Sequence, residues 1–169
     1  MNKKYEFTGI VKNGLRQIKR ISDGLTGGYI EKEENLSHEG DCWISDDARI
    51  FGDARIFGTA LISGNARIFD NALISGNARI SDNAWISGDA WISNGHITKS
   101  EQVITFNGGQ YALTLNLSSN WIQIGCQEMP FNEWLKVSKE DAINLGLKAD
   151  LYYIYKQVIL GLGNLYKLK

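Results

Sequence analysis

The chain carries few of the side chains that catalyse reactions near neutral pH. It has two histidines, His38 and His96, and two cysteines, Cys42 and Cys126, in 169 residues. Histidine is suited to general acid–base catalysis near neutral pH, so these two histidines are the candidate catalytic residues. The histidines and cysteines lack the spacing of metal ligands, and no metal site is predicted. The sequence also shows no nucleophilic triad, phosphate-binding loop or paired-carboxylate motif, and no cofactor is predicted.

Arginines and aromatic residues form a second set with chemical capacity, because they recur at equivalent places in a repeated sequence. The candidate ligand- or partner-binding residues are Arg49, Phe51, Arg55, Arg67, Phe69, Arg79, Trp85 and Trp91. A guanidinium group binds phosphate through paired hydrogen bonds, and aromatic rings stack on bases. Arg, Phe and Trp are also enriched where subunits meet. These residues therefore predict a site for a small anionic, nucleotide-like ligand, an interface with a partner, or both.

The repeat that positions these residues has a period of six. An isoleucine stands at every sixth position, namely Ile44, Ile50, Ile56, Ile62, Ile68, Ile74, Ile80, Ile86 and Ile92. An alanine follows four residues after each isoleucine up to Ile86, namely Ala48, Ala54, Ala60, Ala66, Ala72, Ala78, Ala84 and Ala90. Between them lie Gly, Asp and Asn, which tolerate tight turns. This period is typical of a β-solenoid in which each hexad is one short strand and one corner.

Three hexads per coil would stack residue n on residue n+18 and create three outward faces. The first would carry Arg49, Phe51, Arg67, Phe69 and Trp85, the second Arg55, Phe57, Leu73 and Trp91, and the third Trp43, Leu61 and Arg79. Nine hexads predict about three triangular coils with isoleucine inside. Arg49 and Arg67 would lie on neighbouring rungs, where like charges need an anion, an acidic partner or a stacking ring.

The hexads from Cys42 to Ser93 follow an aliphatic-x-Gly-Asx-Ala-x pattern and resemble the hexapeptide-repeat, left-handed β-helix family. The resemblance implies left-handed coiling and a homotrimer. Many members of that family are acyltransferases that use a histidine as general base at a subunit cleft, a role that would fall here to His38 or His96. Such enzymes commonly carry a loop that protrudes from the coils, and the repeats from Ile44 to Ser93 contain no insertion. This difference favours a non-enzymatic protein.

The segment before the repeats carries a more specific resemblance. The run LTGGYIEKEENLSHEGDCWIS, from Leu25 to Ser45, followed by Asx-Ala-x-Ile repeats, resembles a group of uncharacterised proteins that is frequent in phage and prophage genomes. The resemblance extends over about residues 15–93 and implies a phage-encoded chain.

Three functions are compatible with these features. The first is a non-enzymatic homotrimeric binding protein that captures a small anionic ligand or blocks a host protein, for example to counter a host defence. The second is a CoA-dependent acyltransferase that uses His38 or His96, and the third is a purely structural assembly module. Acyl-CoA turnover that is lost with either histidine would favour the second. Nucleotide binding that is lost with Arg49 or Arg67 would favour the first.

Irregular hexads predict the ends of the solenoid, which we place at residues 38–96, after an N-terminal cap formed by residues 1–37. His38 falls in an isoleucine position and Cys42 in an alanine position, as in an atypical capping coil. His96 falls in an alanine position, where an imidazole would not fit, so we expect the tube to stop or widen there. Gly27 and Gly28 are expected in a loop that begins near Asp23.

Residues 97–169 are expected to form an α+β cap or oligomerisation segment. Strands are predicted over 103–106, 111–117 and 121–124 as a small antiparallel meander. Ser138 with Asp141 resembles a capping box, and Gly146 would close that helix. Asp150 would cap a further helix over 151–160, followed by a fraying tail. The predicted fold is therefore mainly β, with C-terminal helices.

Bulk composition excludes several classes of protein. The formal net charge of -1 gives no global field, which argues against general nucleic-acid binding or adsorption to a membrane. No segment is long and apolar enough for a membrane span, and the first residues lack the apolar run of a signal peptide. Two cysteines do not make a disulfide framework. We therefore expect a cytoplasmic location, which would be the host cytoplasm for a phage-encoded chain.

Overall fold

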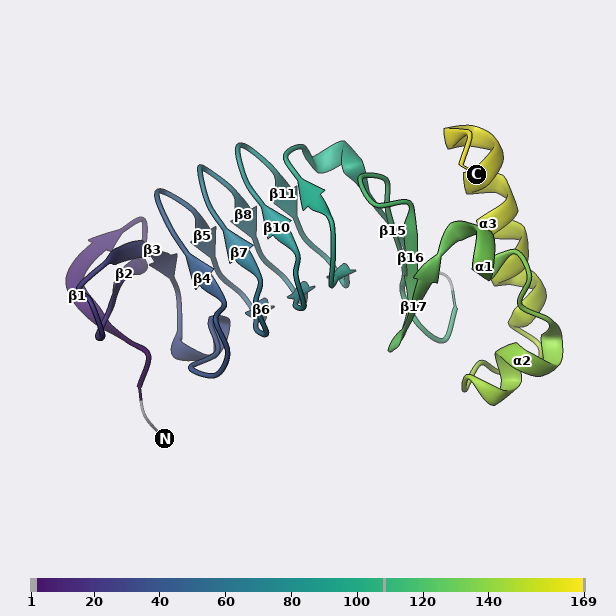
Figure 1. The fold of residues 1–169 in the computed structure, drawn as a ribbon, viewed down its shortest axis with the longest axis horizontal. Coiled ribbons are helices and arrows are strands. Elements are labelled where there is room, and N and C mark those ends of the chain that lie inside the picture. The colour runs from purple at the N-terminus through teal and green to yellow at the C-terminus, as the bar shows by residue number, and fades with distance from the viewer. Residues whose placement is uncertain (1–2, 108, 169) are drawn as a thin grey trace. The chain divides into compact units, whose positions relative to one another are not determined.

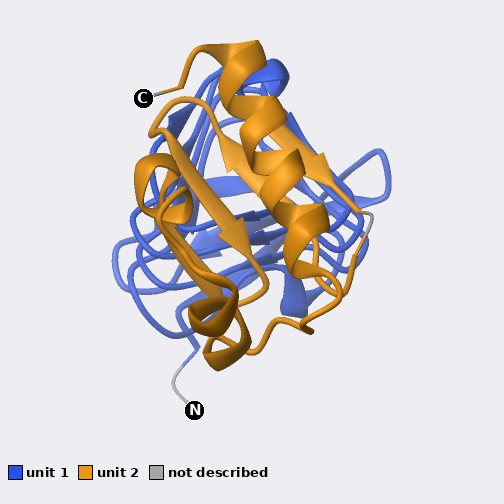
Figure 2. Cartoon of the chain, turned by 90° about the vertical axis from the view of Figure 1, so that its right-hand side faces the viewer, with its two compact units in different colours: residues 1–103 blue, residues 104–169 orange. Residues whose placement is uncertain are grey.

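The computed structural model describes residues 3–107 and 109–168. Residues 1, 2, 108 and 169 of the predicted end segments lie outside the described residues. The chain forms two compact units, residues 1–103 and 104–169, which Figure 2 shows in different colours. No helix in the described ranges is long and apolar enough to cross a membrane.

The hexads form the β-solenoid that their period predicts (Figure 1). Each contributes a two-residue strand: β4 (Trp43–Ile44), β5 (Arg49–Ile50), β6 (Arg55–Ile56), β7 (Leu61–Ile62), β8 (Arg67–Ile68), β9 (Leu73–Ile74), β10 (Arg79–Ile80), β11 (Trp85–Ile86) and β12 (Trp91–Ile92). A last strand, β13 (His96–Ile97), follows them. Strands three hexads apart pair in parallel, and Arg49 lies opposite Arg67 as the predicted stacking requires.

Isoleucine fills the interior of the solenoid. The nine repeat isoleucines are at most 2 % exposed, and the eight repeat alanines are at most 1 % exposed. Burial of each aliphatic side chain contributes roughly 1.5–3 kcal/mol to the free energy of unfolding. A single hexad therefore adds little stability, whereas the whole stack adds much. Several corners adopt a left-handed backbone at Gly or Asp, for example at Asp46 and Gly52. These residue types tolerate that conformation best.

Three parallel sheets form the walls of the solenoid, which we call the first, second and third faces. The first face contains β3 (Thr26–Ile30), β5, β8 and β11; the second contains β6, β9 and β12; the third contains β4, β7, β10 and β13. A bridge between Leu36 and Ile56 adds a further rung to the second face. The solenoid thus has about four coils rather than about three, because β3 and Leu36 begin a coil before the first regular hexad.

An N-terminal hairpin extends the first face. Strand β1 (Tyr5–Lys12) pairs antiparallel with β2 (Leu15–Arg20), which pairs antiparallel with β3. The loop predicted at Gly27 and Gly28 is wrong, because both residues are buried within β3. A Cβ at Gly28 would lie 2.6 Å from the carbonyl oxygen of Ala48, so only glycine lets β3 pass this close to the next coil.

At the N-terminal end, the predicted register is wrong for His38. Leu36 occupies the isoleucine position opposite Ile56, because the corner between Leu36 and Ile44 is longer than a regular hexad corner. The 3₁₀ helix η1 (Glu33–Asn35) forms the preceding corner. Cys42 is fully buried in the predicted alanine position, and its backbone amide donates to the Gly58 carbonyl at 3.0 Å.

At the other end, the position predicted for His96 is also wrong. Gly95 takes the place of the repeat alanine, since its carbonyl oxygen accepts the backbone N–H of Arg79 at 2.9 Å. His96 therefore points outward opposite Arg79, and the buried Ile97 continues the isoleucine column above Ile80. The tube continues past His96 because the last corner is one residue shorter. The 3₁₀ helix η2 (Ser100–Gln102) follows.

In the part that the structure describes, the second unit contains a small sheet and three helices. Its four-stranded sheet comprises β14 (Val103–Phe106), which begins at the boundary between the units, β15 (Leu113–Asn116), β16 (Trp121–Ile124) and β17 (Gln127–Pro130). The helices are α1 (Phe131–Trp134), α2 (Lys139–Asn144) and α3 (Tyr152–Tyr166). The buried core contains Leu113, Leu115, Ile122, Phe131, Trp134, Tyr155 and Ile159. Three predicted strands are confirmed, with β15 shorter than expected, and β17 was missed.

The helix signals in this unit have mixed outcomes. Ser138 caps α2, because its hydroxyl accepts the backbone N–H of Asp141 at 3.1 Å, as the capping box predicts. Asp150 does not cap the last helix, since α3 begins after Leu151 without a side-chain capping bond. The helix also continues to Tyr166, and Gly163, which was expected in the tail, packs directly on the buried ring of Phe131.

Candidate functional site

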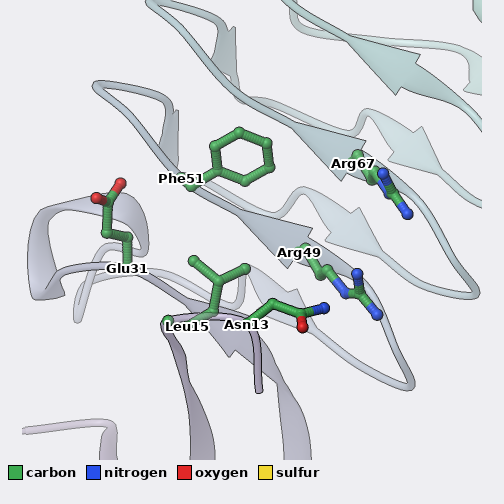
Figure 3. Close-up of a pocket in the computed structure, with 7 residues that line it drawn as sticks. Asn13, Leu15, Glu31, Arg49, Phe51 and Arg67 are labelled. Atoms are coloured by element: carbon green, nitrogen blue, oxygen red, sulfur yellow. The ribbon is translucent and has the colours of Figure 1, made fainter. Parts of the chain in front are cut away.

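A groove of about 410 Å³ lies where the N-terminal hairpin meets the first face (Figure 3). Its lining residues are Asn13, Gly14, Leu15, Glu31, Arg49, Phe51 and Arg67. Asn13 and Gly14 form the turn between β1 and β2, and both adopt left-handed backbone. The hexads supply one wall of this groove, and the segment before them supplies the other.

Two arginines dominate the charge of the groove. Arg49 and Arg67 are directly paired on β5 and β8, and Figure 3 shows their side chains extending in the same direction. Strand spacing separates these rungs by about 4.8 Å, so the two positive charges repel each other. Neither guanidinium has a carboxylate within ion-pair distance in the described ranges. An anion bound between them would relieve this repulsion.

Aromatic rings continue the surface beside these arginines. Phe51 and Phe69 stack face to face, with ring centroids 5.0 Å apart and planes 3° from parallel. Arg67 lies over the ring of Trp85, with its guanidinium carbon 4.9 Å from the ring centroid. The first face therefore places flat apolar rings next to fixed positive charge, which is the combination that recognises an aromatic anion.

Glu31 lines the same groove and supplies its negative charge. Its carboxylate accepts the backbone N–H of Gly52 at 2.6 Å, which fixes the side chain against the corner after β5. Lys32 pairs with Asp53 at 2.6 Å beside it. Because the Glu31 carboxylate bonds to the corner and not to Arg49 or Arg67, it leaves both of these guanidinium groups available to a ligand. It also disfavours an anion at its own end of the groove.

The structure distributes the eight candidate binding residues over all three faces. Arg49, Phe51, Arg67, Phe69 and Trp85 belong to the first face, Arg55 and Trp91 to the second, and Arg79 to the third. Only Arg49, Phe51 and Arg67 line the first-face groove. The hairpin residues that complete this groove were not among the candidates. The Asn13-Gly14 pair, a common hairpin turn signal, was the available clue to them.

His38 is held in a partly buried site near the N-terminus and is not among the groove-lining residues. Its ring stacks on Tyr5 with centroids 4.3 Å apart, and its Nδ1 accepts the backbone N–H of Lys4 at 3.2 Å. Burial lowers the pKa of His38, and the Glu33 carboxylate, 4.0 Å from Nε2, opposes this shift. The bond from Lys4 and the burial of the ring both favour the neutral imidazole.

His96 is exposed on the third face, where its Nε2 lies 2.9 Å from the hydroxyl of Ser81. The two histidines are thus apart from the arginine pair of the first face. Cys42 and Cys126 are both free thiols. Among the described residues, no group of three or more His, Cys, Asp or Glu side chains is arranged to hold a metal ion.

Comparison with known proteins supports the repeat architecture. A model of the YdcK beta-solenoid repeat matches residues 72–88 and, overlapping them, residues 78–94. These matches cover part of the regular hexads. No curated protein matches the chain. The repeat match and the fold together identify a β-solenoid repeat protein. They do not indicate a ligand, so the binding properties of its surfaces are inferred from the residues described above.

Proposed function

We propose that this chain is a non-enzymatic binding protein that captures a small, nucleotide-like anion in the first-face groove. The observation that carries the proposal is the pair of neighbouring guanidinium groups of Arg49 and Arg67, which have no carboxylate within ion-pair distance in the described ranges and lie beside Phe51. Charge-assisted hydrogen bonds from both arginines would hold a phosphate, and the phenyl ring would contact the base.

The rigid solenoid supports this function because it fixes the binding groups before the ligand arrives. Arg49 and Arg67 lie next to Ile50 and Ile68, which are fully buried in paired strands. Little backbone ordering is therefore needed on binding, which lowers its entropic cost.

Titration with adenosine monophosphate tests the proposal. We expect it to bind more tightly than inorganic phosphate or adenosine, because only the nucleotide engages both the arginines and the aromatic ring. Replacing Arg49 or Arg67 by Gln should weaken binding at least about tenfold, since a charge-assisted hydrogen bond contributes roughly 1.5–3 kcal/mol. Isothermal titration calorimetry at low and moderate salt measures both effects.

Arg55→Gln is the matched control, because Arg55 occupies the same hexad position on the second face. It should leave nucleotide affinity unchanged. Equal affinities for the nucleotide, phosphate and adenosine, or equal losses in the Arg49 and Arg55 variants, would contradict the proposal.

The proposal also includes the oligomeric state of the protein and its biological context. We infer a homotrimer from the resemblance to the hexapeptide-repeat family and from the exposed aromatic residues Phe57 and Trp85. Sedimentation equilibrium should then give three times the chain mass of 18.9 kDa, and a monomer would refute this part. A cytoplasmic, phage-encoded protein that counters a host defence, by binding the anion or blocking a host protein, is the setting that the N-terminal resemblance supports.

A further inference from the structure

A second groove, of about 380 Å³, runs along the third face of the solenoid. The outward residues that stack along it from rung to rung are Trp43 on β4, Leu61 on β7, Arg79 on β10 and His96 on β13. Leu25 widens the apolar end, and the side chains of Ser45, Ser63 and Ser81 line it as well. Arg20, which pairs with Asp23, lies over the Trp43 ring with its guanidinium carbon 5.1 Å from the ring centroid. The exposed apolar surface of the groove is therefore that of Leu25 and Leu61, and it lies next to the cationic Arg79.

The short last corner creates the cationic end of this groove. A regular hexad would have placed another residue opposite Arg79, but the missing residue brings His96 outward into register with it. The Ser81 hydroxyl, 2.9 Å from Nε2 of His96, holds the imidazole in place. Arg79 and His96 are both exposed, and none of the described residues that line this groove is acidic. An anionic group at this end would meet hydrogen-bond donors without a competing acid.

Two exposed leucines form the apolar part of the groove. Leu61 is 37 % exposed and Leu25 is 46 % exposed, whereas Trp43 is buried and its ring lies under Arg20. Two rung spacings separate Leu61 from His96, which is about 10 Å at the usual distance between strands. A ligand that covers both ends must therefore be elongated, with one charged end and one apolar end.

From this polarity we infer a second binding site, for a small amphiphile with an anionic head group and an unbranched apolar tail. The head group binds Arg79 and His96, and the tail lies over Leu61 towards Leu25. The site shares no lining residue with the first-face groove, so it does not depend on the nucleotide proposal.

Octanoate is the probe, with acetate and octanol as controls that lack the tail or the charge. Calorimetric titration of the full chain should show that octanoate binds at least about tenfold more tightly than either control, because only octanoate uses both ends of the groove. Arg79→Gln should weaken octanoate binding at least about tenfold and leave the weak binding of octanol unchanged. Leu61→Ser should reduce the preference for octanoate over acetate.

Arg55→Gln and Leu73→Ser are matched controls, because these residues occupy the equivalent hexad positions on the second face. Both should bind octanoate as the unmodified chain does. The inference is overturned if octanoate binds no better than acetate, or if the Arg79 and Arg55 variants lose affinity equally. Circular dichroism of each variant separates a lost site from a lost fold.

Discussion

The two histidines show that the role of a residue depends on its register in the coil. Counting in sixes places both histidines wrongly. The corner after Leu36 is longer than a regular corner, and the corner before His96 is shorter. Counting works for Arg49 and Arg67, since regular hexads separate them. Periodicity predicts positions within unbroken repeats, whereas a change in corner length depends on local turn geometry that the period does not contain.

His38 makes a residue-scale prediction about the pH dependence of stability. Burial lowers its pKa, so below about pH 6.5 the unfolded chain binds more protons than the folded chain. The contribution of His38 to the free energy of unfolding is therefore fully present above this pH and is lost as the pH falls below it. His38→Gln should remove this dependence. Urea denaturation at about pH 7.5 and about pH 5.5 measures it.

The charged neighbours of His38 are Glu33, which favours its protonation, and Lys3 and Lys4, which oppose it. If the His38 variant and the unmodified chain lose the same stability between the two pH values, the burial argument fails.

At the scale of elements, two corners of the first unit share one construction: the corner before Leu36, which contains η1, and the corner after Ile97, which contains η2. Tyr29–Leu36 reads YIEKEENL and 96–103 reads HITKSEQV, and each contains a 3₁₀ turn closed by a side-chain amide. The side-chain oxygen Oδ1 of Asn35 accepts the backbone N–H of Lys32 at 2.9 Å. The side-chain oxygen Oε1 of Gln102 accepts the backbone N–H of Lys99 at 2.9 Å. The two segments share the pattern Lys-x-x-Asn/Gln, which is visible in the sequence but does not follow the period of six.

Asn35 and Gln102 make an element-scale prediction. Asn35 is fully buried, and its amide nitrogen also donates to the Gly52 and Ala54 carbonyls at 3.1 and 2.8 Å. Asn35→Ala would leave several buried groups unpaired, so we expect a loss of about 3 kcal/mol in the free energy of unfolding. Gln102 is only partly buried, and water can replace its bonds, so Gln102→Ala should cost about 1 kcal/mol.

Denaturant unfolding of both variants measures this difference. Equal losses would show that the two corners are equally accessible to water, contrary to the burial of Asn35.

The contribution of packing also explains why the helix cap predicted at Asp150 is wrong. Its carboxylate was assigned from residue type alone, whereas the start and length of α3 depend on packing contacts such as that between Gly163 and Phe131.

At the scale of the whole first unit, the interior was predictable and the grooves were only partly so. A period of six specifies which side chains are buried, because isoleucine recurs at each position whose side chain points into the solenoid. The grooves depend on residues outside the period. Glu31 and the Asn13-Gly14 turn complete the first-face groove, and Leu25 and His96 complete the other. Recognition therefore arises where irregular segments meet the regular walls.

The central claim is that the wall bearing Arg49 and Arg67 binds a nucleotide-like anion. Mapping backbone amide shifts by nuclear magnetic resonance during titration with adenosine monophosphate tests it most directly. We predict the largest changes at residues 49–51 and 67–69 and at the hairpin turn around Asn13, with small changes around Arg55 and Arg79. Changes centred on the second or third face, or no saturable changes, would contradict the account.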